Sequence, residues 1–141
     1  MRPQEALSRV DLFQGLSRDV LDELVQRGST HQTGSGTVLV QQGSPESGLQ
    51  LVLEGTATVF VNGVERGSMG EGDFFGEISL IDSEPRSATV IAGPDGVRTF
   101  AVSPLSFSEL LDANPSICRT LLTVLTARIR QIQSPASSDN D

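Results

Sequence analysis

Hydrophobic and polar positions divide the chain into helical and strand-like stretches. Residues 17–28 carry apolar side chains at helical spacing, namely Val20, Leu21, Leu24 and Val25. Ser17 can cap this helix and Gly28 can end it. An apolar cluster precedes it, at Leu7, Val10, Leu12 and Phe13. We therefore expect the chain to open with helical structure.

The middle of the chain has the pattern of strands. Short β-branched segments are separated by closely spaced glycines. The clearest strands are residues 48–54 and 56–61, and the Asn-Gly pair at 62–63 is typical of a type I′ turn. Residues 87–92 and 97–102 predict two more strands, joined by a Gly-Pro-Asp-Gly turn. This stretch therefore predicts a run of antiparallel hairpins.

Two helices are predicted after the strands. Pro104 suits a first helical turn, and the helix that it opens should end near Asn114. Pro115 starts a second helix, whose apolar stripe consists of Ile117, Leu121, Val124, Leu125, Ile129 and Ile132. The breadth of this stripe favours docking against the chain's own β-structure over a dimer seam. The sequence leaves open whether the protein is a monomer or a homodimer through this helix.

The domain organisation is simple. We find no internal repeat, and the length suits one hydrophobic core. Residues 1–133 are predicted to form one domain. Residues 134–141 are small, polar and acidic, which predicts a disordered tail.

Charge and composition argue against several functions. The 18 acidic residues against 10 basic ones give a net charge of -8, so no direct nucleic-acid binding is expected. All basic residues are arginines, so P-loop and Schiff-base chemistry lack their lysine. His31 is the only histidine, which argues against a multi-histidine metal site and against a Ser-His-Asp hydrolase. We therefore expect neither an enzyme nor a metal or cofactor.

The single cysteine and the lack of long apolar runs bear on the compartment. Cys118 allows no disulfide within the chain, which is typical of a reducing cytoplasm, and we expect it to be a buried helical thiol. No stretch has the length of a signal peptide's apolar core or of a membrane span. The sequence predicts a soluble cytoplasmic protein without membrane insertion.

Residues 72–89 carry the candidate chemistry. Gly76 allows close approach to the backbone, and a helical turn beginning near Glu77 would direct unpaired N–H groups at an anion. Pro85 is followed by Arg86, whose planar fork can bind two phosphate oxygens, and Ser87 adds a neutral donor. A carboxylate beside a phosphate is unfavourable unless the ligand brings hydroxyls for Glu77 to accept from. Phosphate and ribose together indicate a nucleotide.

This segment resembles the phosphate-binding cassette of the cyclic nucleotide-binding domain family, which includes the catabolite activator protein and the protein kinase A regulatory subunit. Gly76, Glu77 and Arg86 have the family's spacing, and Pro-Arg-Ser-Ala-Thr resembles its Pro-Arg-x-Ala-Thr. Similar motifs extend from Leu12-Phe13-x-Gly-Leu-Ser17 to Arg128-Ile129-Arg130. The resemblance implies a mainly β fold: an eight-stranded antiparallel, jelly-roll-like β-roll with an N-terminal helix and two C-terminal helices.

The resemblance also implies roles for individual residues. Glu77 would bind the ribose 2′-hydroxyl, Arg86 the equatorial phosphate oxygens, and the backbone amides of Ser79 and Ser87 would complete the cup. The full predicted ligand-binding set is Gly76, Glu77, Ile78, Ser79, Arg86, Ser87 and Ala88. Phe74 and Phe75 are interpreted as core residues, with base stacking as the alternative.

The ligand and the signal follow from the same resemblance. A serine after the arginine occurs in bacterial cAMP receptors and in cGMP-selective members, so Ser87 leaves the choice between cAMP and cGMP open. The missing lysine indicates a GC-rich bacterial genome, where cAMP would be the default. The family's adenine contacts are not carried over, because Ile132 and Gln133 occupy those places. No DNA-binding domain follows, so we expect a sensor that relays binding through residues 115–133 to an effector that the sequence does not name.

Two other readings compete with the sensor. A degenerate copy would keep the fold, bind no ligand and serve as a protein interaction module. A cupin-type enzyme would share the strand pattern but would need a bound metal.

Overall fold

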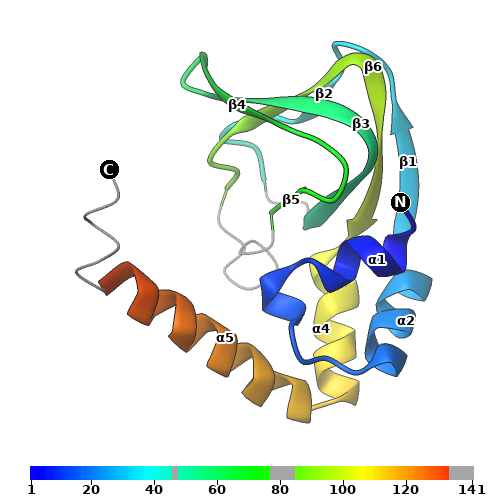
Figure 1. Ribbon diagram of the computed structural model, residues 1–141, viewed down its shortest axis with the longest axis vertical. Helices are drawn as coiled ribbons and strands as arrows, with labels where there is room; N and C mark the ends of the chain where they lie inside the picture. The colour runs from blue at the N-terminus through cyan, green and yellow to red at the C-terminus, as the bar shows by residue number, and fades with distance from the viewer. Residues whose placement is uncertain (46–47, 77–84, 134–141) are drawn as a thin grey trace.

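The computed structural model describes residues 1–45, 48–76 and 85–133. The chain opens with α1 (Pro3–Ser8), the 3-10 turn η1 (Asp11–Phe13) and α2 (Arg18–Arg27). The strands of the described part are β1 (Ser29–Thr33), β2 (Val38–Val40), β3 (Leu49–Val61), β4 (Val64–Met69), β5 (Phe74–Phe75) and β6 (Thr89–Val102). The helices α4 (Pro104–Ala113) and α5 (Ser116–Gln133) complete the fold, with the strands at one end of the molecule and the helices at the other (Figure 1).

Local signals set the helix boundaries as predicted. Ser17 precedes α2, and its Oγ accepts a hydrogen bond from the Val20 backbone N at 3.3 Å. Ser103 caps α4 in the same way, 3.1 Å from the Ser106 backbone N, with Pro104 in the first turn. The helix α1 was not predicted as a separate element. Its Glu5 accepts from the Arg2 side chain and backbone, which lowers the pKa of the Glu5 carboxyl.

The strands form one antiparallel sheet in the order β1-β6-β3-β4, with β2 paired to β6 and β5 paired to β3. The two long strands β3 and β6 pair along most of their length and both change register near Gly55. The backbone at Gly55 has φ +89°, which favours glycine and bends β3. The described residues form six strands where the resemblance implied eight, and the mainly β, antiparallel fold class with flanking helices is confirmed.

The predicted turn at residues 93–96 is wrong. In the structure, Ala92 lies opposite Ala57 and Val97 opposite Gly55, so both halves of β6 run in the same direction along β3. The Gly-Pro-Asp-Gly segment is therefore a bulge opposite Thr56, not a chain reversal. A Cβ at Gly93 would overlap the Thr56 hydroxyl, which explains why a glycine is needed there. The same pairing corrects the division at Gly55, because β3 continues through it.

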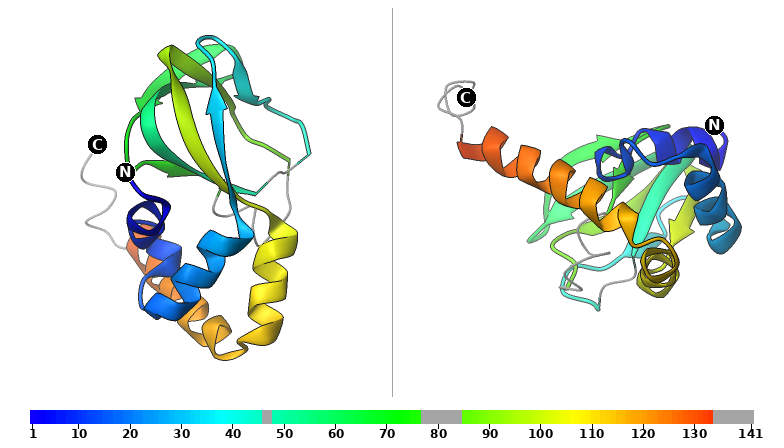
Figure 2. Two further views of the ribbon diagram at one scale, coloured as in Figure 1. Left: turned by 90° about the vertical axis from the view of Figure 1, so that its right-hand side faces the viewer. Right: turned by 90° about the horizontal axis from the view of Figure 1, so that it is seen from below.

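Alternate residues of the central strands face two separate cores. One set packs against α1, α2, α4 and the start of α5, and its strand members are Leu49, Leu51, Leu53, Phe100 and Val102. The other set faces the interior of the roll, where Val52, Ala57, Val90, Ala92 and Val97 are buried. The left view of Figure 2 shows α2 and α4 directly below β1 and β6. The sheet thus separates a helical half from the interior of the roll.

The last helix is docked on the rest of the domain over only part of its length. Ile117 and Leu121 are buried in the core that the helices share, and α5 contacts η1 and α4. Farther along, Ile129 is 55% exposed, and Figure 1 shows this end of α5 running away from the other helices. Over its first half the apolar stripe therefore packs into the core that the helices share with one face of the sheet. Cys118 is exposed, not buried as expected, because it follows the inward-facing Ile117 by one position.

The tail at 134–141 lies outside the described residues. Among the described helices, none has the length and apolar character needed to cross a bilayer.

Candidate anion-binding site

Arg86 is a buried cation held between two strands. Its side chain is only 7% exposed, although the sequence suggested a residue reaching out of a loop. Its Nη2 donates to the Gly48 carbonyl oxygen at 2.5 Å, and its guanidinium carbon lies 5.9 Å from the centre of the Phe75 ring. Burial of a guanidinium costs free energy, which this hydrogen bond and the cation–π contact partly offset. The planar fork is consequently fixed in one orientation.

The backbone of Arg86 is fixed as well. Its N–H donates to the Ser44 carbonyl oxygen at 3.1 Å, and its carbonyl accepts from the Gly43 N–H at 2.8 Å. Three residues later, the Thr89 hydroxyl accepts from the Gln42 backbone N at 2.9 Å. The start of β6 is thereby joined to the segment after β2 on both sides of Ser87.

Gly76 lies against the same arginine. Its φ is +84°, and a Cβ at this position would overlap both the Arg86 guanidinium and the Gly48 carbonyl oxygen. Only glycine combines this backbone conformation with such close approach. The predicted reason for Gly76 was access for a ligand. The structure adds a second reason, because the glycine makes room for the arginine.

The structure brings some of the predicted residues together and leaves others undescribed. Gly76 and Arg86 are in contact, and after them come the exposed Ser87 and the half-buried Ala88. The remaining three members of the predicted set, Glu77, Ile78 and Ser79, lie outside the described residues. The ligand-binding roles of all seven residues stay predictions.

Sequence reasoning missed two parts of this site. Gly48 was interpreted as a turn glycine that begins the predicted strand 48–54, but the contact of its carbonyl with Arg86 was not predicted. The two phenylalanines of β5 were interpreted as core residues with one ring pointing inward, but the contact of one ring with Arg86 was not predicted. Phe74 packs with the helix-side core, whereas Phe75 packs with the interior of the roll and contacts Arg86. Period-2 alternation in β5 is the signal that separates them.

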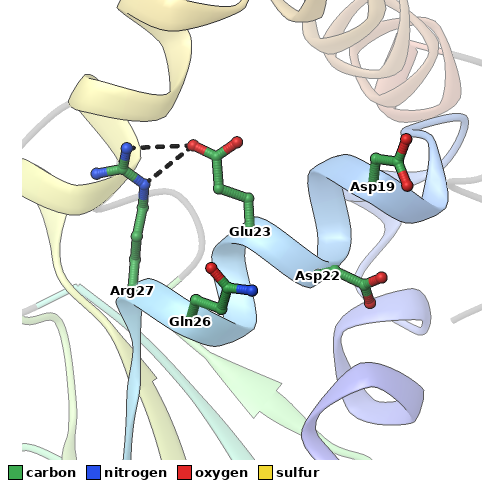
Figure 3. A pocket seen from close by; sticks show the side chains of 5 residues that line it. All are labelled: Asp19, Asp22, Glu23, Gln26 and Arg27. Carbon is green, nitrogen blue, oxygen red and sulfur yellow. Dashed lines mark hydrogen bonds and ion pairs between the residues drawn. The ribbon is translucent and has the colours of Figure 1, made fainter.

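A different hollow, on α2, has the wrong charge for an anion. It is lined by Asp19, Asp22, Glu23, Gln26 and Arg27 (Figure 3). Its arginine is already paired, at 3.1 Å with Glu23 and at 3.1 Å with Glu109 on α4. The net negative charge of this hollow repels phosphate, so the surroundings of Arg86 are the better anion site.

The described residues also bear on a metal centre. No group of three or more His, Cys, Asp or Glu side chains comes together within the described part of the chain. His31 is exposed on β1, with its Nε2 2.8 Å from the Ser29 hydroxyl.

The sequence model of one family, described as the cyclic nucleotide-binding domain, matches residues 31–114. The chain belongs to the cyclic nucleotide-binding domain family. A cyclic nucleotide-gated potassium channel from Mesorhizobium japonicum is 36% identical over 118 residues, covering 83% of this chain and 32% of the channel. This chain therefore spans about a third of the length of that channel.

Solved structures agree with this assignment. The N-terminal domain of a transcriptional regulator from Streptomyces coelicolor superposes with a TM-score of 0.81 at 28% identity, covering 90% of this chain and 94% of that one. The catabolite activator protein of Thermus thermophilus gives a TM-score of 0.69 at 28% identity, covering 87% of this chain and 60% of that one. The resemblance inferred from the residues around Arg86 is thus confirmed at the level of the family.

Proposed function

We propose that this domain is a regulatory sensor in which Arg86 binds the cyclic phosphate of cAMP. The observation that carries the proposal is the fixed, buried guanidinium between Gly48 and Phe75. A fork held in one orientation loses little entropy when two phosphate oxygens bind to it, and the low dielectric around it strengthens the attraction. An acidic chain can therefore bind an anion at this one place.

Nucleotide recognition rests on the segment that precedes Arg86. Glu77 is proposed to accept from the ribose 2′-hydroxyl, and the amides of Ser79 and Ser87 to donate to the phosphate. The relatives support a cyclic nucleotide, because the Mesorhizobium japonicum protein is named as a channel gated by one. We take cAMP as the ligand and cGMP as its competitor, since Ser87 is compatible with both.

The helix α5 is proposed to relay binding. Its first half is fixed in the shared core, while farther along Val124 and Leu125 are half-buried and Ile129 is exposed. These apolar side chains can gain contacts if the helix moves towards the ligand, which gives the bound state its advantage. In the alternative in which the protein is a homodimer, this exposed face of α5 would form the dimer interface. We infer a non-catalytic, cytoplasmic role with an effector that is another protein or domain.

Calorimetric titration tests the ligand. The protein is titrated with cAMP and with cGMP, alongside Arg86→Leu, which removes the fork but keeps much of the volume. Arg98→Leu is the matched control. Arg98 lies on β6 and pairs with Glu54 at 3.5 Å, and its substitution changes the net charge by the same amount as Arg86→Leu. We expect cAMP to bind the parent and the control alike, and binding to fall about a hundredfold or more in Arg86→Leu.

The other outcomes separate the rival readings. Saturable binding of cGMP alone would reassign the ligand. Absence of binding to both nucleotides would favour the ligand-free interaction module. Metal in the purified protein would favour the cupin-type enzyme.

A further inference from the structure

Gln50 is a polar exception on the face of β3 that points into the roll. It lies between Leu49 and Leu51, which are buried on the opposite face against the helices, so its own side chain faces the interior. The next residue on its face, Val52, is fully buried, and the interior is lined mainly by hydrophobic residues, with Thr99, which pairs with Val52, as a buried polar residue. A half-buried amide at this position therefore needs an explanation.

The register places Gln50 beside the candidate site. It comes two residues after Gly48, whose carbonyl holds Arg86, and it lies directly opposite Phe75 in the β3–β5 pair. Residues directly opposite each other in an antiparallel pair have Cβ atoms about 5 Å apart and share one face of the sheet. Gln50 and Arg86 are therefore both neighbours of the Phe75 ring.

The side-chain amide of Gln50 has no hydrogen bond within the part of the chain that the structure describes. Its position on a paired strand fixes the backbone, so only side-chain rotation is needed to direct the amide. Its NH2 group is a neutral donor, which can bind an anion without adding charge to the interior.

We propose that Gln50 is a ligand-binding residue whose side-chain N–H donates to a phosphate oxygen of the nucleotide that Arg86 binds. This inference rests on the proposed function and extends it to a strand outside residues 76–89. Arg86 supplies the charge that attracts the phosphate. Gln50 donates a hydrogen bond to one phosphate oxygen from a different side. Because its acceptor is charged, this hydrogen bond is of the stronger kind.

The test combines substitutions with sulfur-substituted ligands. Gln50→Leu removes the donor at nearly constant volume, and Gln50→Glu keeps the shape but adds a charge that repels phosphate. Gln26→Leu makes the same chemical change on the exposed surface of α2 and serves as the control. Each protein is titrated with cAMP and with the two phosphorothioate diastereomers, in which sulfur replaces one or the other exocyclic phosphate oxygen.

We expect Gln50→Leu to weaken cAMP binding about tenfold or more, Gln50→Glu to weaken it further, and the control to leave it unchanged. The decisive readout is coupling: one diastereomer should bind the parent less well than cAMP, and this difference should disappear in Gln50→Leu. Thermal unfolding should show that Gln50→Leu stays folded, since leucine suits the interior of the roll.

Three results would overturn the inference. If Gln50→Leu binds cAMP like the parent, the amide does not contact the ligand. If it weakens cAMP and both diastereomers by one common factor, Gln50 acts on the structure and not on a phosphate oxygen. If the parent itself binds no cyclic nucleotide, the proposed function fails and the inference fails with it, which is distinct from failure at Gln50 alone.

Discussion

The contact between Gly76 and Arg86 can be tested by adding one methyl group. In Gly76→Ala, the left-handed backbone at φ +84° costs about 1–2 kcal/mol for any residue with a Cβ. The new Cβ also overlaps the Gly48 carbonyl oxygen and the Arg86 guanidinium. The guanidinium is the end of a flexible side chain, but the carbonyl belongs to the backbone, so relief of the overlap costs about 1–3 kcal/mol more.

The control for this change is Gly36→Ala. Gly36 has nearly the same conformation, with φ +76°, but apart from its chain neighbours no atom of the described residues lies within 4 Å of its added Cβ. Gly36→Ala should therefore lose only the 1–2 kcal/mol of the backbone term, and Gly76→Ala about 2–5 kcal/mol in total. Urea unfolding of both variants measures the difference, and cAMP titration should show weaker binding only in Gly76→Ala. Equal losses of stability in the two variants would refute the close approach of Gly48 and Arg86 to Gly76.

Two further predictions concern the sheet and the last helix. Thr99 is 1% exposed, and its hydroxyl has no hydrogen-bond partner among the described residues. Thr99→Val should therefore raise the free energy of unfolding by about 1 kcal/mol, whereas Thr30→Val on the exposed edge should not. A loss of stability on Thr99→Val would instead mean that a buried water satisfies the hydroxyl. Saturating cAMP should slow amide hydrogen exchange in α5, and unchanged exchange there would contradict the proposed relay.

The helices could be predicted closely because their signals are local. Ser17 and Ser103 lie within three residues of the backbone N–H groups that they cap, so sequence neighbours alone determine where α2 and α4 begin. Cys118 shows the limit of this reasoning. Helical spacing identified the stripe of α5, but which residues beside that stripe are covered depends on η1 and α4, and Cys118 proved exposed.

The error at residues 93–96 has a non-local cause. Gly-Pro-Asp-Gly has the composition of a turn, and nothing near it in the sequence indicates that the chain continues in its original direction. The direction is set by β3, which pairs with β6 on both sides of the bulge. Gly96 shows the same dependence on distant residues, since a Cβ there would lie 2.8 Å from the Thr33 carbonyl oxygen.

The sequence predicted which residue types form the candidate site, but not which distant residues hold them in place. The spacing of Gly76 and Arg86 was sufficient to identify a family, because that motif is local. The burial of Arg86 was not predicted, since the carbonyl that holds it belongs to Gly48, 38 positions earlier. The position of Gln50 beside the site was not predicted for the same reason, because only the pairing of β3 with β5 places it opposite Phe75.

The register of β3 therefore connects the hydrophobic pattern to the site. Leu49, Leu51 and Leu53 are all buried against the helices, which fixes the face that each residue of this strand presents. A slip by one residue would expose these leucines to the interior of the roll and turn Gln50 into the helical core. It would also remove the Gly48 carbonyl from Arg86, because neighbouring carbonyls of a strand point in opposite directions. The burial of three leucines thus holds the arginine in place, although none of them is a predicted ligand contact.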